Sequence, residues 1–586
     1  SRYQEGERDL FGVESKFDPI QVDSLFGSAG LTLFDRVKFL FNYIQDTWSG
    51  ATPIATAPVD LRGNRPTSPD GVSGATPFIA PGNLLFFDSQ FNVLNTDGSG
   101  NLTGGINNQL VHTLSSASPE TRKQGDFRLG YEWDEVALNV GGGVSLKNDY
   151  EARWGSLNGR WDFNQKLTTL GLGLSYTKSD IEALLDHDAI PYILDVSLNT
   201  TPFRIGPAPY REGQIEILGT LGDRTLRGKR EDWAAHLGLT QVLSKNALIE
   251  TGLGFTRSTG FLENPYKVVE VAFIDPKQQF RAPPGGFVGE VHALLERRPD
   301  VRNQWTWDAR YVHYVEPLNA ALHLSYRFYS DDWGIDAHTF EADWGQPLGG
   351  GWTITPRIRY YSQEAADFYR PFLISKQAAE TPVIDKETGD FIGIRPYDPK
   401  KLPANFSSDH RLSGYGALSG GVTVAKEFAR GVSIEAGFEY YTHQGGLKLG
   451  GGGEGDYADF DYWQANAALR VNLSPMLSVA EGGPGARHAG PAFGDPDRGG
   501  HAGHADHDHG PHAPAGVMAG HMLPKAGDFM VGYRYMFSLQ GGDTLRGSHA
   551  ASDQAIIFQG CGVDVCRLTP EEMSMHMHMP ELMYAP

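Results

Sequence analysis

Long apolar runs are missing from this sequence of 586 residues. A transmembrane helix needs about 18 or more consecutive apolar residues, so we expect neither such a helix nor a retained signal peptide. Helical periodicity alternating with strand patterns is also missing, which argues against a chain of several α/β enzyme modules. No methionine precedes Met476, and we therefore expect that the chain was trimmed from an exported precursor.

Positive charge and cysteine are both scarce. The 71 acidic residues outnumber the 50 lysines and arginines and leave a net charge of -21, which argues against nucleic acid as a partner because phosphate binding needs basic patches. Acidic loops favour solubility; alternatively, they hold Ca²⁺ near anionic lipid head groups. The only cysteines, Cys561 and Cys566, are candidates for a small disulfide loop in an oxidising periplasm, with a thiolate metal site as the alternative.

What the sequence does contain is a regular alternation of apolar and polar residues. Between Ala320 and Phe328 every second residue is apolar, and the residues between them include His323, Ser325 and Arg327. A period of two is typical of β-strands, whose successive side chains point to opposite faces. In hydrocarbon such strands satisfy their backbone only when closed into a barrel. We therefore predict an all-β fold, a transmembrane antiparallel up-and-down β-barrel, with a soluble β-sandwich as the alternative.

Sixteen strands can be assigned by this alternation, and we expect a barrel of about 16 strands, within a range of 16–18. Long connections, such as 49–123, 179–231 and 363–410, follow only odd-numbered strands, whereas the connections after even-numbered strands are short. Outer-membrane barrels have long extracellular loops and short periplasmic turns. This parity predicts a bacterial outer-membrane location and a periplasmic start for the chain after residue 474. The assigned strands are 2–11, 20–34, 36–48, 124–133, 136–147, 152–163, 167–178, 232–243, 247–257, 303–314, 318–330, 335–346, 352–362, 411–427, 432–443 and 460–473.

The polar face of these strands carries many charges. Sixteen strands enclose a lumen that is too wide for side chains alone to fill. The charges either pair across neighbouring strands and hold the wall together, or they line a polar conduit or ligand site beneath loops that fold inward. The lumen-lining candidates are Arg160, Asp308, Arg310, Arg327, Arg357, Arg359, Glu435, Glu439 and Arg470.

Five stretches of sequence carry a resemblance to a known family. They are Tyr3–Glu7, Asp46–Pro53, Asp331–Phe340, Arg359–Tyr369 and Ser407–Leu418. Together they resemble the bacterial outer-membrane family catalogued as domain of unknown function 3570, in the right order from residue 1 to about 474. The resemblance implies a barrel in the outer membrane, but it brings no established reaction or substrate, so no catalytic residue is carried over. The sequence departs from the family pattern because it continues to residue 586.

The continuation concentrates residues that bind soft metals. Residues 475–525, rich in Gly, Pro and His, are expected to form a flexible periplasmic linker, and residues 526–586 a Met/His-rich β-hairpin segment. Imidazole suits Cu, Zn and Ni, and thioethers suit Cu(I). Alternatively, the histidines are polar spacers and the methionines pack against apolar neighbours. The metal candidates are His501, His504, His507, His509, His512, Met573, Met575, His576, Met577, His578 and Met579.

Three classes of function compete. The first is an outer-membrane pore or scaffold whose periplasmic segment binds copper-like metals, and the second is a docking barrel that organises envelope proteins without transporting a solute. An enzyme is the least supported class, because nucleophile-elbow, zincin and phosphate-loop motifs are missing. Outer-membrane lipid and lipopolysaccharide are the expected partners, with periplasmic proteins or lipoproteins as further candidates.

Overall fold

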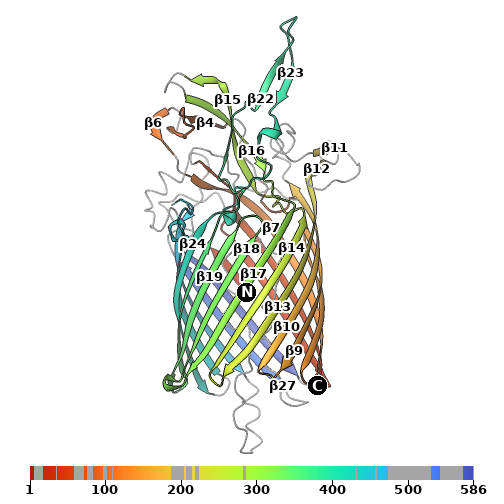
Figure 1. The fold of residues 1–586 in the computed structure, drawn as a ribbon, viewed down its shortest axis with the longest axis vertical. Helices are drawn as coiled ribbons and strands as arrows, with labels where there is room; N and C mark the ends of the chain where they lie inside the picture. The colour runs from red at the N-terminus through yellow and green to blue at the C-terminus, as the bar shows by residue number, and fades with distance from the viewer. Residues whose placement is uncertain are drawn as a thin grey trace, which may run out of the picture.

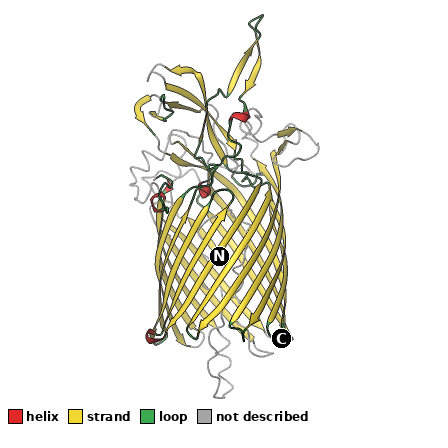
Figure 2. Ribbon diagram, in the orientation of Figure 1, coloured by secondary structure: helices red, strands yellow, loops and turns green. Residues whose placement is uncertain are grey.

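The main body of the molecule is a closed barrel of eighteen antiparallel strands (Figures 1 and 2). The ring closes where β1 pairs with β28, with Tyr3 opposite Met575. In order around the ring the wall strands are β1 (Arg2–Glu5), β2 (Gln21–Leu33), β3 (Val37–Pro58), β7 (Leu110–Glu132), β8 (Val136–Lys147), β9 (Tyr150–Phe163), β10 (Thr168–Leu185), β13 (Arg224–Ser244), β14 (Ala247–Gly260), β17 (Val301–Val315), β18 (Ala320–Asp331), β19 (Asp336–Gly349), β20 (Trp352–Gln363), β24 (Tyr415–Ala429), β25 (Val432–Gln444), β26 (Phe460–Asn472), β27 (Phe529–Gly541) and β28 (Glu572–Tyr584).

This description rests on a computed structural model. It describes residues 1–5, 18–34, 36–58, 72–75, 83–96, 102–107, 110–185, 203–205, 214–217, 224–280, 286–429, 432–455, 458–472, 529–541 and 572–584. No helix within these ranges is long and apolar enough to cross a membrane.

The predicted barrel is confirmed, and its strand count lies at the upper end of the expected range. Each of the sixteen strands assigned from the sequence has a counterpart in the wall. The two further strands, β27 and β28, come from the Met/His-rich segment, whose position relative to the barrel the sequence had left open. They pair with each other, with β26 and with β1, so this hairpin is part of the wall.

The two ends of the barrel differ in their connections. At one end, which we call the turn rim, neighbouring strands are joined by residues 34–36, 133–135, 164–167, 245–246, 316–319, 350–351 and 430–431. The turn at 350–351 uses Gly350 and Gly351 at φ values of 59° and 82°, a left-handed backbone that glycine adopts without strain. Residues 473–528 also begin and end at the turn rim, because Asn472 of β26 pairs with Gly532 of β27. The opposite end, the loop rim, carries the other long connections.

The outward face of the wall is apolar, as the alternation predicts. Leu174, Leu253 and Leu324 are between 43% and 54% exposed on the middle of their strands. Aromatic residues lie toward both rims, with Trp233 and Trp305 on the loop side and Tyr314 and Trp352 on the turn side. An apolar band between two aromatic girdles is the exterior of an outer-membrane-type barrel.

A cap built from the long connections covers the loop rim (Figure 1). We define it as the described residues of 72–75, 83–96, 261–300 and 364–414. Its main sheet has the order β21 (Leu373–Ser375), β15 (Val268–Phe280), β16 (Gly286–Leu295), β4 (Asn83–Phe87). Smaller elements at this end are β5 (Leu94–Thr96), β6 (Leu102–Ile106), β11 (Phe203–Ile205), β12 (Gln214–Ile217), β22 (Glu380–Ile384) and β23 (Phe391–Pro396).

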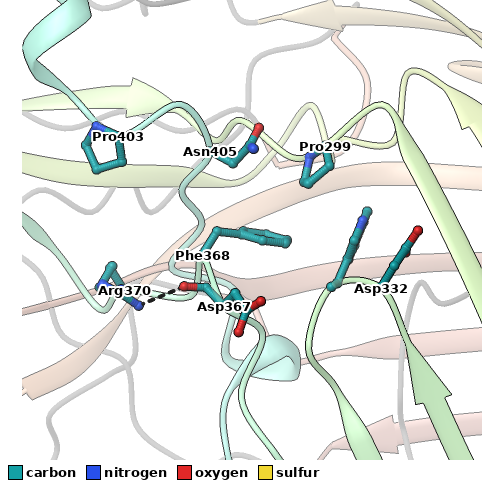
Figure 3. Close-up of a pocket in the computed structure, with 8 residues that line it drawn as sticks. Pro299, Asp332, Asp367, Phe368, Arg370, Pro403 and Asn405 are labelled. Atoms are coloured by element: carbon teal, nitrogen blue, oxygen red, sulfur yellow. Dashed lines mark hydrogen bonds between the residues drawn. The ribbon is translucent and has the colours of Figure 1, made fainter.

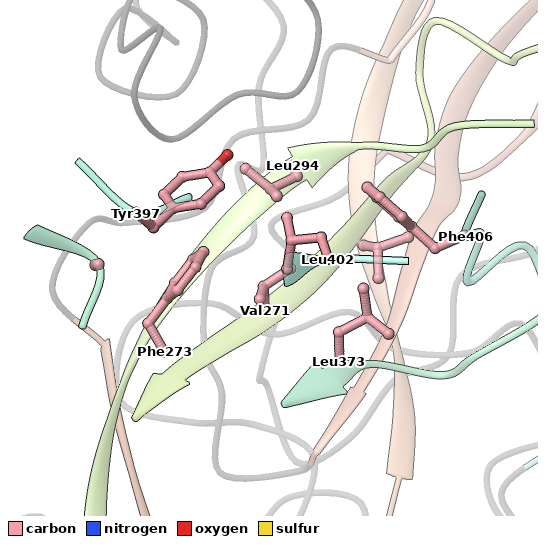
Figure 4. Packing of buried hydrophobic residues seen from close by; sticks show 9 residues of the cluster. Val271, Phe273, Leu294, Leu373, Tyr397, Leu402 and Phe406 are labelled. Atoms are coloured by element: carbon pink, nitrogen blue, oxygen red, sulfur yellow. The ribbon is translucent and has the colours of Figure 1, made fainter. Parts of the chain in front are cut away.

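The cap has apolar cores of its own (Figure 4). In one of them Val271 and Phe273 of β15 pack with Leu294 of β16, and segment 364–414 adds Leu373 and the fully buried Phe406. Burying a side chain of this size stabilises by roughly 1.5–3 kcal/mol, so the cap is a packed body rather than a set of loose loops.

A second core joins the cap to the wall. Val268 and Leu295 of the cap pack against Ala183 of β10 and Leu226 of β13. These two wall strands are therefore longer at the loop rim than the sequence pattern predicts. The sequence pattern predicts a long connection over 179–185 and 224–231, because the apolar side chains here, such as Ala183 and Leu226, lie on the inward face against the cap, whereas outward residues such as Asp180 are polar and exposed.

Candidate functional site: the lumen beneath the cap

The structure places the nine predicted lumen residues on the inward face of the wall. Their positions in each strand alternate with the apolar residues of the outward face, for example Arg327 between Tyr326 and Phe328. Three of them pair with a neighbouring carboxylate. Arg160 lies 3.4 Å from Asp162, Arg310 lies 3.5 Å from Glu250, and Arg357 lies 3.2 Å from Glu341. Pairing within and between neighbouring strands therefore accounts for part of the inward charge.

A basic cavity of about 320 Å³ lies in the lumen directly below the cap. The wall strands β17–β20 contribute arginines, tyrosines and small residues, and the cap contributes two further arginines and a carboxylate. The residues lining it are Arg298, Arg302, Arg327, Tyr329, Ile335, Ala337, Thr339, Arg359, Tyr361, Gln363, Asp409, Arg411 and Leu412. Most of them belong to three of the stretches that carry the family resemblance, namely Asp331–Phe340, Arg359–Tyr369 and Ser407–Leu418.

Buried carboxylates hold the three arginines at the top of the cavity. Asp409 accepts from Arg298 at 2.8 Å and from Arg411 at 2.7 Å. Burial opposes the charge of Asp409, but Arg411 and Lys267 outweigh this penalty and hold the pKa of the carboxyl well below its usual range. Arg302 donates to Asp331 at 2.6 Å and lies over the Trp333 ring at 4.3 Å. The Arg298–Asp409 pair joins two segments of the cap, and the Arg302–Asp331 pair joins the wall strands β17 and β18.

Sequence reasoning missed Arg298, Arg302, Asp409 and Arg411. Arg298 and Asp409 lie in connections, where period-two alternation gives no information about side-chain direction. The available signal was that Asp409 and Arg411 fall in the stretch Ser407–Leu418, which the resemblance had already singled out.

A second cavity, of about 310 Å³, lies between cap segments and the connection from β18 to β19 (Figure 3). Phe368 lies near its centre, and Arg370 donates to the backbone carbonyl of Asp367 at 3.2 Å. The Asp332 carboxylate accepts from the side chain of Asn303 at 2.6 Å. The cavity is lined by Pro299, Asp332, Trp333, Asp367, Phe368, Arg370, Pro403 and Asn405.

The predicted Met and His ligands of β28 lie on opposite faces of the wall. Met573, Met575, Met577 and Met579 share the inward parity, and Met536 of β27 lies opposite Met577. His576 and His578 are exposed on the outward face, where Tyr535 and Tyr533 lie within hydrogen-bond distance of their Nδ1 atoms, at 2.9 and 2.7 Å. The structure therefore brings the thioethers together without the imidazoles.

Other metal predictions cannot be placed. His501, His504, His507, His509, His512, Cys561 and Cys566 lie outside the described residues. Within the described ranges, no three His, Cys, Asp or Glu side chains converge as a metal site.

Comparison with known proteins gives low-identity structural likenesses. A mutant of the ferric enterobactin receptor PfeA from Pseudomonas aeruginosa has 10% identity and a TM-score of 0.36, covering 93% of this chain and 65% of the receptor. The siderophore receptor PirA from Acinetobacter baumannii has 8% identity and a TM-score of 0.38, covering 99% of this chain and 72% of the receptor. CdiB from the same organism has 7% identity and a TM-score of 0.32, covering 86% of this chain and 66% of its own.

No curated protein matches the sequence. The sequence pattern described as "Protein of unknown function (DUF3570)" matches residues 1–464, which include every wall strand from β1 to β25 and part of β26. The protein therefore belongs to the DUF3570 family.

Proposed function

We propose that this protein is a gated conduit of the bacterial outer membrane, in which the cap controls access of a solute to the lumen. The observation that carries the proposal is the position of the cap: it has its own apolar cores, and it is held at the loop rim where Val268 and Leu295 pack against the wall strands β10 and β13. Beneath it the inward face is polar and charged. A separately packed body over a polar lumen is the arrangement that a gate requires.

The orientation follows from the connections. In outer-membrane barrels short turns face the periplasm and long loops face outward. The cap then lies outside, next to lipopolysaccharide, and the turn rim, where β26 ends and β27 begins, faces the periplasm. The apolar outward face contacts membrane lipid.

Conductance through planar bilayers tests the gate. The intact chain should pass little current, and a variant lacking the hairpin β15–β16 should pass much more, because this hairpin supplies most of the cap sheet. Residues 268–295 can be replaced by a short turn, since the Glu296 amide already donates to the Lys267 carbonyl at 3.2 Å.

A matched control removes a different cap hairpin. Residues 380–396 form β22 and β23, which extend away from the barrel (Figure 1). Their removal is geometrically simple, because the Tyr397 amide donates to the Ala379 carbonyl at 2.8 Å. The control should conduct like the intact chain. If the β15–β16 deletion assembles in the membrane and still conducts no more than the control, the conduit is wrong and a docking barrel without solute is favoured.

A second candidate function is the handling of a soft metal such as Cu(I). It is favoured by the strip of inward thioethers formed by Met573, Met575, Met577, Met579 and Met536. Thioethers bind Cu(I) and Ag(I) and stay available at low pH, whereas ordinary imidazoles are largely protonated at about pH 5.

Silver binding at about pH 5 tests this candidate. Replacing the four methionines of β28 by leucine nearly conserves volume and should remove most of the bound silver. Replacing His576 and His578 by asparagine, on the outward face of the same strand, should leave it unchanged. Equal silver binding by the methionine variant and the unmodified chain would exclude the thioether strip as the site.

A further inference from the structure

We propose that the cavity below the cap is a binding site for a small organic oxyanion, carrying phosphate or carboxylate groups, held by Arg327 of β18 and Arg359 of β20. The proposal deepens the gated conduit, on which it rests, by naming the class of solute. The whole chain has a net charge of -21, so an excess of positive charge at one place in it requires a reason.

The cavity has more guanidinium groups than carboxylates. Five arginines line it, and three of them are neutralised, Arg302 by Asp331 and the pair Arg298 and Arg411 by Asp409 and Glu296. Arg327 and Arg359 have no ion-pair partner among the described residues. Two positive charges therefore face the cavity uncompensated.

Arg359 also has an unused donor. Its Nε is buried from solvent and makes no hydrogen bond within the described part of the chain. A buried donor without an acceptor costs about 1–3 kcal/mol, so such groups are rare unless a ligand supplies the acceptor. A planar guanidinium offers parallel N–H donors that match the two oxygens of a carboxylate or phosphate.

The strand between the two arginines leaves room for the ligand. Arg327 pairs in register with Thr339 of β19, and Thr339 pairs with Tyr361 of β20. The inward residues of β19 at this level, Ala337 and Thr339, are small, which opens the space between the long side chains of β18 and β20. The threonine hydroxyl faces this space and is a further hydrogen-bond donor.

Two carboxylates lie opposite these arginines in register, and neither fills the site. Glu341 of β19 lies opposite Arg359, but it pairs with Arg357 at 3.2 Å. Asp308 of β17 lies opposite Arg327, but its carboxylate is turned toward β14 on the other side of β17. A Cβ atom placed on Gly252 of β14 would lie 2.8 Å from the Asp308 Oδ1 and 2.8 Å from the His236 Nε2. The Asp308 carboxylate therefore lies on the side of β17 that faces β14 and His236, away from Arg327.

The remaining lining suits the carbon skeleton of an organic anion. Tyr329 and Tyr361 bring aromatic faces, and Ile335 and Leu412 bring apolar side chains. The hydroxyl groups of both tyrosines are already bound, that of Tyr361 to Gln363 at 2.6 Å and that of Tyr329 to Asp331 at 2.7 Å. A volume of about 320 Å³ lies at the small end of ligand pockets, which fits a metabolite rather than a polymer.

Calorimetric titration of the full chain in detergent tests the site. Citrate and glucose 6-phosphate are the probes, and glucose is the neutral reference. At least one of the two anions should bind and glucose should not. Arg327→Gln and Arg359→Gln should each weaken binding at least about tenfold, as expected for loss of a charged hydrogen-bond donor. The matched control is Arg310→Gln. Arg310 is another lumen arginine, but it is paired with Glu250, so this variant should bind the anion like the unmodified chain.

Two outcomes would overturn the site. One is that the unmodified chain binds neither anion, and the other is that Arg310→Gln weakens binding as much as Arg327→Gln and Arg359→Gln. Binding in detergent requires no passage through the barrel. If the unmodified chain binds the anion but the β15–β16 deletion conducts no more than its control, the conduit is overturned and the site stands. If the deletion conducts more than its control but the unmodified chain binds no anion, the site is overturned and the conduit stands.

Discussion

Arg298 and Asp409 lie 2.8 Å apart, guanidinium to carboxylate, although 111 residues separate them in the chain. Arg298 precedes β17, and Asp409 lies in the segment between β20 and β24. Their contact joins two connections that leave the barrel at different places, and it forms the roof of the basic cavity.

Asp409→Asn should loosen the cap without unfolding the barrel. The substitution removes the charge that compensates the buried Arg298 and Arg411, and breaking a buried pair from one side costs about 3–5 kcal/mol. The expected result is faster protease cleavage within 364–414, measured on protein whose barrel still resists heat and detergent. Glu380→Gln, at an exposed position of β22, is the control, and equal cleavage of both variants would contradict the role of Asp409.

Glu270→Gln should flatten the pH dependence of cap stability. Burial raises the pKa of Glu270 to about 8, above the ordinary value of 4.5 that applies to the unfolded cap. Between these values the folded cap binds more protons, so its free energy of unfolding falls as pH rises from about 4.5 to 8 and then levels off.

Urea unfolding of the cap at several pH values, followed by hydrogen exchange, measures this effect. Burial also raises the pKa values of Glu263 and Glu454, each to about 7, so the unmodified chain and the variant must be compared at each pH. If both lose stability equally between pH 5 and 8, Glu270 does not carry its proton in the folded cap.

Leu324→Arg should lower the yield of folded barrel, whereas Ser325→Arg should leave it nearly unchanged. Leu324 is 43% exposed on the outward face of β18, and Ser325, the next residue, has the inward parity. A lipid-facing arginine near the middle of a wall strand costs about 2–4 kcal/mol, whereas lumen substitutions are tolerated. The measurement is the yield of heat-modifiable barrel after folding into lipid vesicles. A lower yield for Ser325→Arg than for Leu324→Arg would mean that the faces are assigned the wrong way round.

Phe406→Ala should destabilise the cap by about 3–5 kcal/mol, because Phe406 is fully buried in the core shown in Figure 4. Phe391→Ala, at a position 61% exposed in β23, should change the stability by less than about 0.5 kcal/mol. Urea denaturation of the cap compares the two variants. Similar losses would show that the cap lacks a defined core.

The wall could be predicted from the sequence because each strand carries its own signal. The alternation around Ala320–Phe328 identifies one strand, its lumen face and its lipid face without reference to any partner. Residues 529–541 and 572–584 show the same alternation, but whether such a hairpin joins a barrel depends on pairing with β1, at the other end of the chain. Local pattern contains no information about that pairing.

The cap and its cavity could not be predicted in the same way. β15 contains Val268, Val269, Val271 and Ile274, which are buried on both faces of the strand, so the period-two signal disappears. The arginines of β18 and β20 could be assigned to the lumen by parity. Their participation in a cavity depends on Arg298 and Asp409, which reach it from distant segments.

The pairing of β28 with β1 affects the diameter of the barrel. The family match ends at residue 464, within β26, whereas this ring is completed by two more strands. A relative that stopped after β26 would have to join that strand directly to β1. Since the diameter of a barrel grows roughly in proportion to its number of strands, the barrel of such a relative would be narrower than this one by about one ninth. The methionine-bearing hairpin β27–β28 thus widens the barrel at the point where the ring closes. Removing it would reduce the diameter of the barrel and would also remove the inward methionines from the lumen.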